Sequence, residues 1–247
     1  MNHILLKNLV KYDFNIQYIN HKITFCNLTH MIPYIDIHTH QIIADSSILQ
    51  VFNQIIGQQD VSNSIKTNGI HPWYINQDLK LQLALLEHYT KQPNSIAIGE
   101  CGLDKLASTN WEVQIEAFKE QILLANRLNK PLVIHCVKAY EEVFQQLKQF
   151  QVAVPVFFHG VNKKNTLIES LVKKGYYVGL GAFILHGRHD DLIAKIDLTK
   201  IFLETDDQSI SIVDIYSYFS RIRKISIEQL KEQLVQNFEE VFNYKII

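Results

Sequence analysis

Cysteine is scarce in this sequence, which contains three such residues among 247. Cys26, Cys101 and Cys136 are odd in number and show no Cys-x-x-Cys spacing. The pattern argues against a disulfide framework and against a zinc knuckle, and it is typical of a reducing compartment. We therefore expect a cytoplasmic protein.

Long apolar runs and an excess of one charge are also missing. No run approaches the roughly 18 to 20 apolar residues that cross a bilayer, and Lys7 and Asn8 interrupt the short apolar stretch at residues 4–6 that a signal peptide would need to extend. The 24 Lys and Arg against 25 Asp and Glu give a net charge of -1. Proteins that bind duplex nucleic acid mainly through its phosphates more often have a net positive charge. We expect no membrane association, and nothing in the sequence indicates a protein partner.

Strand-like and helix-like segments alternate from Tyr34 onward, which is typical of repeated βα units around a parallel sheet. Strands are expected at 34–38, 64–70, 95–99, 131–135, 154–159, 176–180 and 200–204. Helices are expected near 45–57, 78–90, 110–129, 138–150, 164–174, 189–196, 211–223 and 227–242. Two of these helices have predicted capping boxes, beginning at Thr109 and at Ser226.

We predict an α/β fold, a TIM-type (β/α) barrel of about seven strands that is distorted or lacks one βα unit. The interval between His40 and His71 is short, and residues 23–25 are the one candidate for a replacement strand. The expected division is an N-terminal extension of uncertain role at 1–32 and a barrel at 33–247.

Five of the expected strands end in residues that can bind a metal ion. These residues are His38 and His40, Glu100, His135, His159, and Asp206. A lone histidine is more often structural, but the recurrence at equivalent strand ends favours a common site at the barrel mouth. Imidazole ligands suit Zn²⁺ or Mn²⁺ better than Mg²⁺. The set is large enough for two divalent ions and indicates a metal-dependent hydrolase.

The two carboxylates in this set have different expected roles. Glu100 can bridge two cations with its two oxygens, and Asp206 can bind an ion while accepting a proton from water. Glu204 and Asp207 compete for the second role. Glu204 shares a strand face with Asp206 but lies one layer deeper, so we expect it to support the site.

Three further residues are candidates for substrate contact. His71 closes the strand before Pro72, and its alternative is a structural role in a proline-rigidified turn. Lys138 and Arg188 fall in loops expected around the barrel mouth, where they would bind phosphate or else be solvated surface charges.

The ordered motifs resemble the TatD family of metal-dependent hydrolases, which are TIM barrels of the amidohydrolase type. The matching segments are 34–40, 69–72, 97–104, 114–118, 121–125, 131–135, 159–160 and 203–206. The resemblance implies that His38, His40, Glu100 and Asp206 hold one ion. Glu100, His135 and His159 would hold the other.

The resemblance also implies an activity, the hydrolysis of phosphodiesters by a deoxyribonuclease. The expected cofactors are two divalent ions, Zn, Mn or Mg, and the expected substrate is DNA or a smaller phosphoester. Val137 stands where the family commonly has arginine, so the substrate rim differs. The alternatives are a small-molecule esterase, lactonase or amidase on the same centre, and a non-catalytic binding module.

Overall fold

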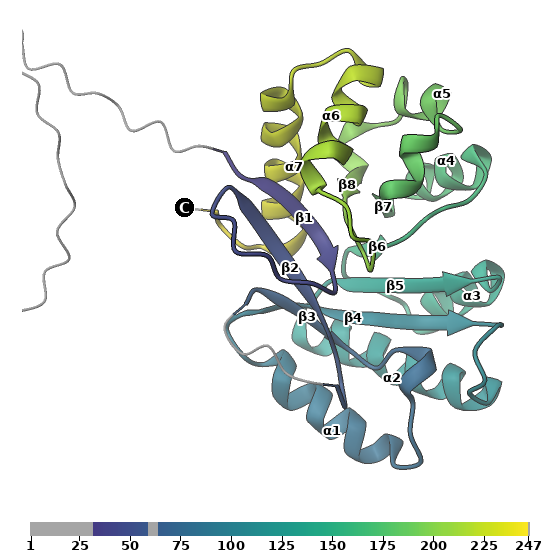
Figure 1. Cartoon of the computed structure of the whole chain (residues 1–247). Coiled ribbons are helices and arrows are strands. Elements are labelled where there is room, and N and C mark those ends of the chain that lie inside the picture. Colours follow the sequence, from purple (N-terminus) through teal and green to yellow (C-terminus); the bar gives the residue numbers. More distant parts are fainter. Residues whose placement is uncertain (1–31, 59–63, 247) are drawn as a thin grey trace, which may run out of the picture. The chain divides into compact units, whose positions relative to one another are not determined.

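The computed structural model describes residues 32–58 and 64–246, and eight parallel strands form its centre (Figure 1). They are hydrogen-bonded in chain order as β1 Tyr34–Thr39, β2 Ile48–Ile55, β3 Lys66–Gly69, β4 Ser95–Asp104, β5 Leu132–Val137, β6 Val156–Phe158, β7 Tyr177–Leu180 and β8 Ile201–Leu203. The predicted N-terminal extension, apart from residue 32, lies outside the described residues, as does the candidate strand 23–25. The boundary at 32 therefore stays a prediction.

The last strand returns to the first, which closes the barrel at its mouth. The Asp206 N–H donates to the His38 carbonyl at 2.9 Å, and the His40 N–H donates to the Asp206 carbonyl at 3.1 Å. The predicted TIM-type barrel is therefore confirmed.

The expected count of seven strands and the helix expected at 45–57 are both wrong. Residues 48, 51, 52 and 55 are apolar at helical spacing, yet the segment is β2. Parallel pairing with β1 on one side and β3 on the other outweighs that local pattern. The sequence therefore contains all eight strands of the barrel.

Helices follow the later strands and cover the outside of the barrel. They are α1 Leu79–Thr90, α2 Trp111–Leu128, α3 Tyr140–Gln149, α4 Asn165–Lys173, α5 Asp190–Ile193, α6 Ile212–Arg223 and α7 Ile227–Phe242. Short 3₁₀ turns are η1 Pro72–Tyr74, η2 Ala182–His186 and η3 Leu198–Lys200. Within the described residues, no helix separates β1 from β2 or β2 from β3. Strand β2 therefore follows β1 with no helix between them, through residues that the structure describes in full.

Side-chain caps begin two of these helices. Ser226 and Gln229 form the predicted capping box at the start of α7. At α2 the cap is Asn110 instead of the predicted Thr109, and its Oδ1 accepts from the Glu112 and Val113 N–H groups. Asparagine is at least as good an N-cap as threonine, so the helix begins one residue later.

The barrel interior is apolar below the mouth. Val133, Phe157 and Phe202 are buried there together with Phe238 of α7. Each of the three strand residues stands two positions before His135, His159 or Glu204, and alternation puts those pairs on one strand face. The apolar layer therefore supports the polar residues at the strand ends. Across the described chain, every helix is too short or too polar to cross a membrane.

Candidate metal centre

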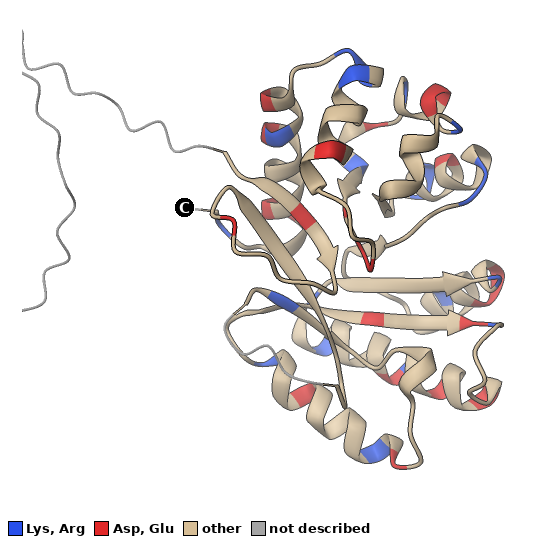
Figure 2. Ribbon diagram, in the orientation of Figure 1, with Lys and Arg blue, Asp and Glu red and all other residues tan. Residues whose placement is uncertain are grey.

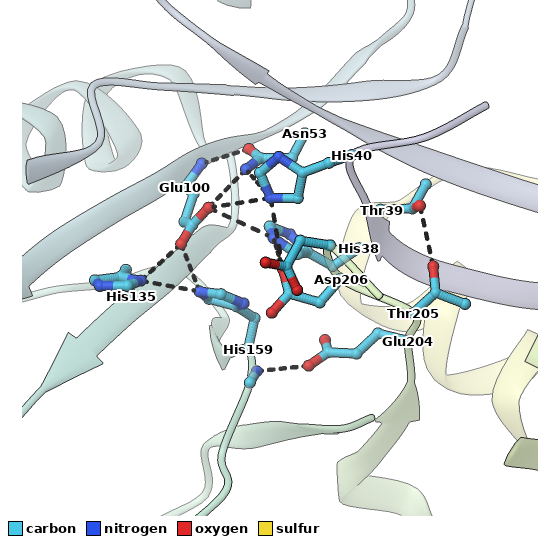
Figure 3. Close-up of polar contacts among 12 residues, drawn as sticks. His38, Thr39, His40, Asn53, Glu100, His135, His159, Glu204, Thr205 and Asp206 are labelled. Carbon is cyan, nitrogen blue, oxygen red and sulfur yellow. Dashed lines mark hydrogen bonds and ion pairs between the residues drawn. The ribbon is translucent and has the colours of Figure 1, made fainter. Parts of the chain in front are cut away.

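The six predicted ligands converge at the barrel mouth (Figure 3). His38 lies in β1 and Glu100 in β4, whereas His135 lies in β5. Of the remaining three, His40 and His159 directly follow β1 and β6, and Asp206 is the third residue after β8. Parallel strands carry all of these side chains to one edge of the sheet, so residues far apart in sequence become neighbours.

Glu100 lies at the middle of the cluster, and its two carboxylate oxygens face different groups. Oε1 is 2.7 Å from His135 Nδ1 and 2.6 Å from His159 Nε2. Oε2 is 3.5 Å from His38 Nε2 and 3.8 Å from His40 Nε2. The arrangement divides the imidazoles into two sets that share one carboxylate.

Asp206 belongs to the Oε2 side. Its Oδ1 is 3.7 Å from His38 Nε2 and 3.5 Å from His40 Nε2. Two carboxylates and two imidazoles thus surround one point, while Glu100, His135 and His159 surround another. The backbone conformation of Asp206 is unusual for a non-glycine residue, because its φ is +56°.

The surroundings of His38 indicate whether these residues suit a metal cation. Its side chain is fully buried, and neither ring nitrogen has a hydrogen-bond partner in the part of the chain that the structure describes. Burial and the charge of His159 lower the pKa of His38 to about 4, so the ring is neutral near pH 7. A neutral, buried imidazole whose nitrogen faces two carboxylates has the lone pair that a metal ion requires. The donor set therefore fits a divalent ion.

Two buried groups show how strongly the centre attracts positive charge. Burial would raise the pKa of Glu100, but the charge of His159 and hydrogen bonds from His135 and His159 hold it well below its usual value. Burial opposes protonation of His159, yet the charge and hydrogen bond of Glu100 raise its pKa to about 10. In the metal-free protein, the His159 imidazolium thus balances the ionised Glu100.

Asp206 is also ionised near neutral pH. Burial disfavours its charge, whereas the hydrogen bond from His40 and the charge of His159 lower its pKa to about 2. An ionised carboxylate can accept a proton.

Asp104 fixes the orientation of His135. Its Oδ2 lies 3.1 Å from His135 Nε2 and accepts from Trp73 Nε1 at 2.6 Å. Both ring nitrogens of His135 therefore face a carboxylate, Nε2 that of Asp104 and Nδ1 that of Glu100, whose Oε1 is 2.7 Å away.

Glu204 lies deeper than Asp206, as the sequence predicts. Its Oε1 accepts from the Gly160 N–H at 2.5 Å. A Cβ at Gly179 would stand 2.2 Å from Glu204 Oε2, so only glycine leaves room for this carboxyl group. Burial raises the pKa of Glu204 to about 8, although the charge of His159 opposes the rise.

Asp36 anchors the turn that carries Asp206. It accepts from the Thr205 N–H at 2.9 Å and from the Thr205 hydroxyl at 2.7 Å. The same hydroxyl lies 3.0 Å from Thr39 Oγ1. These bonds tie the end of β8 to β1 and place Asp206 beside His38 and His40.

The three candidates for substrate contact are placed differently. His71 joins the cluster, with its Nε2 3.2 Å from Glu100 Oε1. Lys138 and Arg188 are exposed in the loops after β5 and after η2, and the structure does not bring them into the cluster. Figure 2 shows Lys and Arg mainly on helices and loops, interspersed with Asp and Glu. The substrate roles of all three residues stay predictions.

Sequence reasoning missed Asn53. Its Nδ2 donates to Glu100 Oε2 at 2.6 Å, and its Oδ1 accepts from the Glu100 N–H at 3.1 Å. The segment around it has helical spacing, which hid a buried polar residue on a strand. The signal that could have revealed it is an amide amid Val51, Phe52 and Ile55.

Gly102, two residues after Glu100, allows close packing of two strands. A Cβ at Gly102, where φ is +143°, would stand 2.0 Å from the His135 carbonyl oxygen. The missing Cβ therefore allows β4 and β5 to approach closely where Gly102 pairs with His135.

A cleft of about 330 Å³ opens beside Asp206. Its lining combines polar side chains, including Asn162, His186 and Gln208, with the aromatic ring of Phe183. Among the described residues that line it, none is Lys or Arg. The cleft gives access to the centre from the side of β6, β7 and β8.

Residues 36–243 match the model of a family described as TatD related DNase. The chain belongs to this family. The match confirms the resemblance, and it spans all six predicted ligands.

Two curated relatives share a similar level of identity. An uncharacterized metal-dependent hydrolase of Haemophilus influenzae is 30% identical over 173 residues, which cover 66% of this chain and 66% of the relative. The 3'-5' ssDNA/RNA exonuclease TatD of Erwinia tasmaniensis is 31% identical over 149 residues, or 57% of this chain and 56% of the relative. The chain thus spans less than two thirds of the length of either relative.

A solved structure shares the fold. The crystal structure of YjjV, a TatD homologue from Escherichia coli K12, matches with a TM-score of 0.71. The match covers 87% of this chain and 100% of that chain at 21% identity. It supports the family's barrel for this chain.

Proposed function

We propose that this protein is a hydrolase of phosphodiester bonds in nucleic acid that uses two divalent ions. The observation that carries the proposal is the position of Glu100, whose two oxygens face two separate sets of ligands. A carboxylate between two ligand sets is the arrangement that a two-metal hydrolase requires. The names of relatives, an exonuclease and a metal-dependent hydrolase, support this class of reaction.

The distances support two ligand sets. His38, His40, Asp206 and Glu100 Oε2 would hold one ion, and His135, His159 and Glu100 Oε1 would hold the other. Bound divalent ions would acidify a water molecule and offset negative charge on the attacked phosphoryl group. The majority of imidazole ligands favours Zn²⁺ or Mn²⁺ over Mg²⁺.

The side chains of the protein contribute orientation and proton transfer. Asp206 is ionised and lines the open cleft, so its carboxylate accepts the proton of the attacking water. Thr205 and Asp36 hold the turn that positions Asp206. Val133, Phe157 and Phe202 exclude water from below.

The cleft supports a second candidate function. Because its described lining has no Lys or Arg, it lacks the side chains that usually neutralise phosphates. A small uncharged ester or lactone would suit this lining better than an oligonucleotide, and the same centre would hydrolyse it.

One experiment separates these functions. The protein is stripped with a chelator and reloaded with Zn²⁺, Mn²⁺ or Mg²⁺. Two quantities are then measured: the bound metal per chain, and the rates at which the protein hydrolyses single-stranded DNA, bis(p-nitrophenyl) phosphate and a lactone. We expect about two ions per chain and metal-dependent cleavage of the DNA. The matched variants are Asp206→Asn, expected to lose at least roughly 10²-fold in rate, and Asp207→Asn at the exposed neighbouring carboxylate, expected to stay active.

Two results would contradict the proposal. Hydrolysis of the lactone without cleavage of either phosphodiester would favour the second candidate. A protein that binds no divalent ion after reloading would refute the metal-dependent mechanism itself.

A further inference from the structure

Two polar side chains outside the proposed ligand sets contact Glu100 from neighbouring strands. Asn53 on β2 donates to Oε2 at 2.6 Å, and His71, just after β3, lies 3.2 Å from Oε1. Asn53 and His71 are both almost fully buried. The amide nitrogen of Asn53 can only donate, but a histidine nitrogen can either donate or bind a metal.

His71 has the position of a further metal ligand. Its ring nitrogen, a Glu100 oxygen and a His135 nitrogen lie close enough together to share one ion. Position alone therefore leaves two roles open, and the protonation of the ring decides between them.

The backbone settles which ring nitrogen of His71 carries the proton. His71 caps η1, and its Nδ1 accepts a hydrogen bond from the Trp73 N–H at 3.1 Å. A backbone N–H can only donate, so Nδ1 must hold a lone pair. In a neutral imidazole the proton then lies on Nε2, the nitrogen that faces Glu100.

His135 differs, because in the described chain neither of its ring nitrogens accepts a hydrogen bond from a backbone N–H. Asp104 faces Nε2 and Glu100 faces Nδ1, so with its proton on Nε2 the ring can offer the Nδ1 lone pair to an ion. His38 has no competing hydrogen bond within the described chain. The centre thus contains histidines with a lone pair available to an ion, and in His71 one histidine whose inward nitrogen bears hydrogen.

We infer that His71 is a positioning residue, a hydrogen-bond donor to the Glu100 bridge and not a metal ligand. Each carboxylate oxygen has two acceptor directions. His71 Nε2–H occupies one direction at Oε1, and Asn53 Nδ2–H occupies one at Oε2. Each oxygen also faces two proposed ligands, His135 and His159 at Oε1 and His38 and His40 at Oε2, and an ion would take the place of those contacts. The inference rests on the proposed two-metal function and adds the two donors that orient its shared ligand.

The test compares three substitutions by metal binding. His71→Gln keeps an N–H donor at the reach of Nε2, whereas His71→Ala removes it, and His135→Gln removes a proposed ligand. Zn²⁺ affinity and stoichiometry are measured by titration calorimetry of chelator-stripped protein, with circular dichroism as a check on folding. We expect His71→Gln to keep the wild-type stoichiometry and an affinity close to wild type. His71→Ala should keep the stoichiometry but bind about 10- to 100-fold more weakly, as is typical when a partner of a ligand is lost. His135→Gln should lose about one ion per chain.

A spectroscopic measurement on the wild-type protein tests the proton directly. Nitrogen-15 correlation spectra should assign His71 as protonated on Nε2 and unprotonated on Nδ1, both without metal and with Zn²⁺. Loss of that Nε2 proton on loading, or loss of one ion in His71→Gln as in His135→Gln, would overturn the inference. A wild-type protein that binds no Zn²⁺ would refute the proposed function, while the metal-free spectrum would still test the donor role of His71.

Discussion

Glu204 predicts an unusual dependence of stability on pH. The side chain is fully buried, Oε1 accepts from the Gly160 N–H, and Oε2 has no partner in the described residues. One donor cannot replace the hydration that a carboxylate loses on burial. Burial therefore raises the pKa of Glu204 from 4.5 to about 8, with the charge of His159 acting in the opposite direction.

The sign of the effect follows from proton binding. Between the unfolded pKa of 4.5 and the folded pKa of about 8, the folded protein holds the Glu204 proton more tightly than the unfolded chain does. The contribution of this group to stability is therefore complete below pH 4.5 and is lost as the pH rises through 8. A displacement from 4.5 to about 8 corresponds to roughly 5 kcal/mol in the free energy of unfolding.

Glu204→Gln removes this titration while keeping an acceptor for the Gly160 N–H. We expect the metal-free wild type to lose stability relative to Glu204→Gln from pH 5 to pH 9, by roughly 4 kcal/mol. Urea unfolding of both proteins in chelator at pH 5, 7 and 9 measures the difference. Glu232→Gln, at an exposed site on α7, is the matched control. A wild-type-minus-variant difference that stays constant across these pH values would refute the reasoning.

Two further predictions concern the carboxylate ligands and the turn that holds Asp206. Glu100→Gln should reduce the metal bound at both subsites, whereas Asp206→Asn should leave the ion held by Glu100 and two histidines. Bound metal per chain distinguishes these results. Equal metal content in Glu100→Gln and wild type would contradict the bridging role. Thr205→Val removes the hydroxyl that donates to Asp36 and should destabilise folding by about 1–3 kcal/mol. Thr205→Ser, which keeps the hydroxyl, should be close to wild type by urea unfolding.

The sequence predicts the barrel well because each ligand follows a run of buried apolar residues. His135 and His159 are examples, since continuous apolar strands are typical of parallel sheets covered on both faces. It fails at β2, where apolar residues at 48, 51, 52 and 55 fit a helix as well as a strand. Only pairing with distant strands decides that ambiguity.

Partners of the ligands are harder to predict than the ligands themselves. The role of Asn53 depends on the pairing of β2, and that of Asp104 on the return of β5 beside β4. The tautomer of His71 depends on a backbone N–H in a turn. Such contacts arise from the three-dimensional positions of strands and turns, which no local sequence pattern specifies.

The protonation of four carboxyl groups at the mouth follows the number and charge of their hydrogen-bond donors. Glu100 and Asp206 face charged or hydrogen-bonding histidines, and their pKa values are lowered in spite of burial. Asp36 has two bonds from Thr205, and burial raises its pKa to about 6. Glu204, with one backbone donor, has a pKa of about 8. Near pH 7 Glu100 and Asp206 at the ligand level are therefore ionised, and so is most of Asp36, while Glu204 stays largely neutral beneath them. At the ligand level, a divalent ion entering the mouth would meet ionised carboxylates at the same depth as the histidine ring nitrogens.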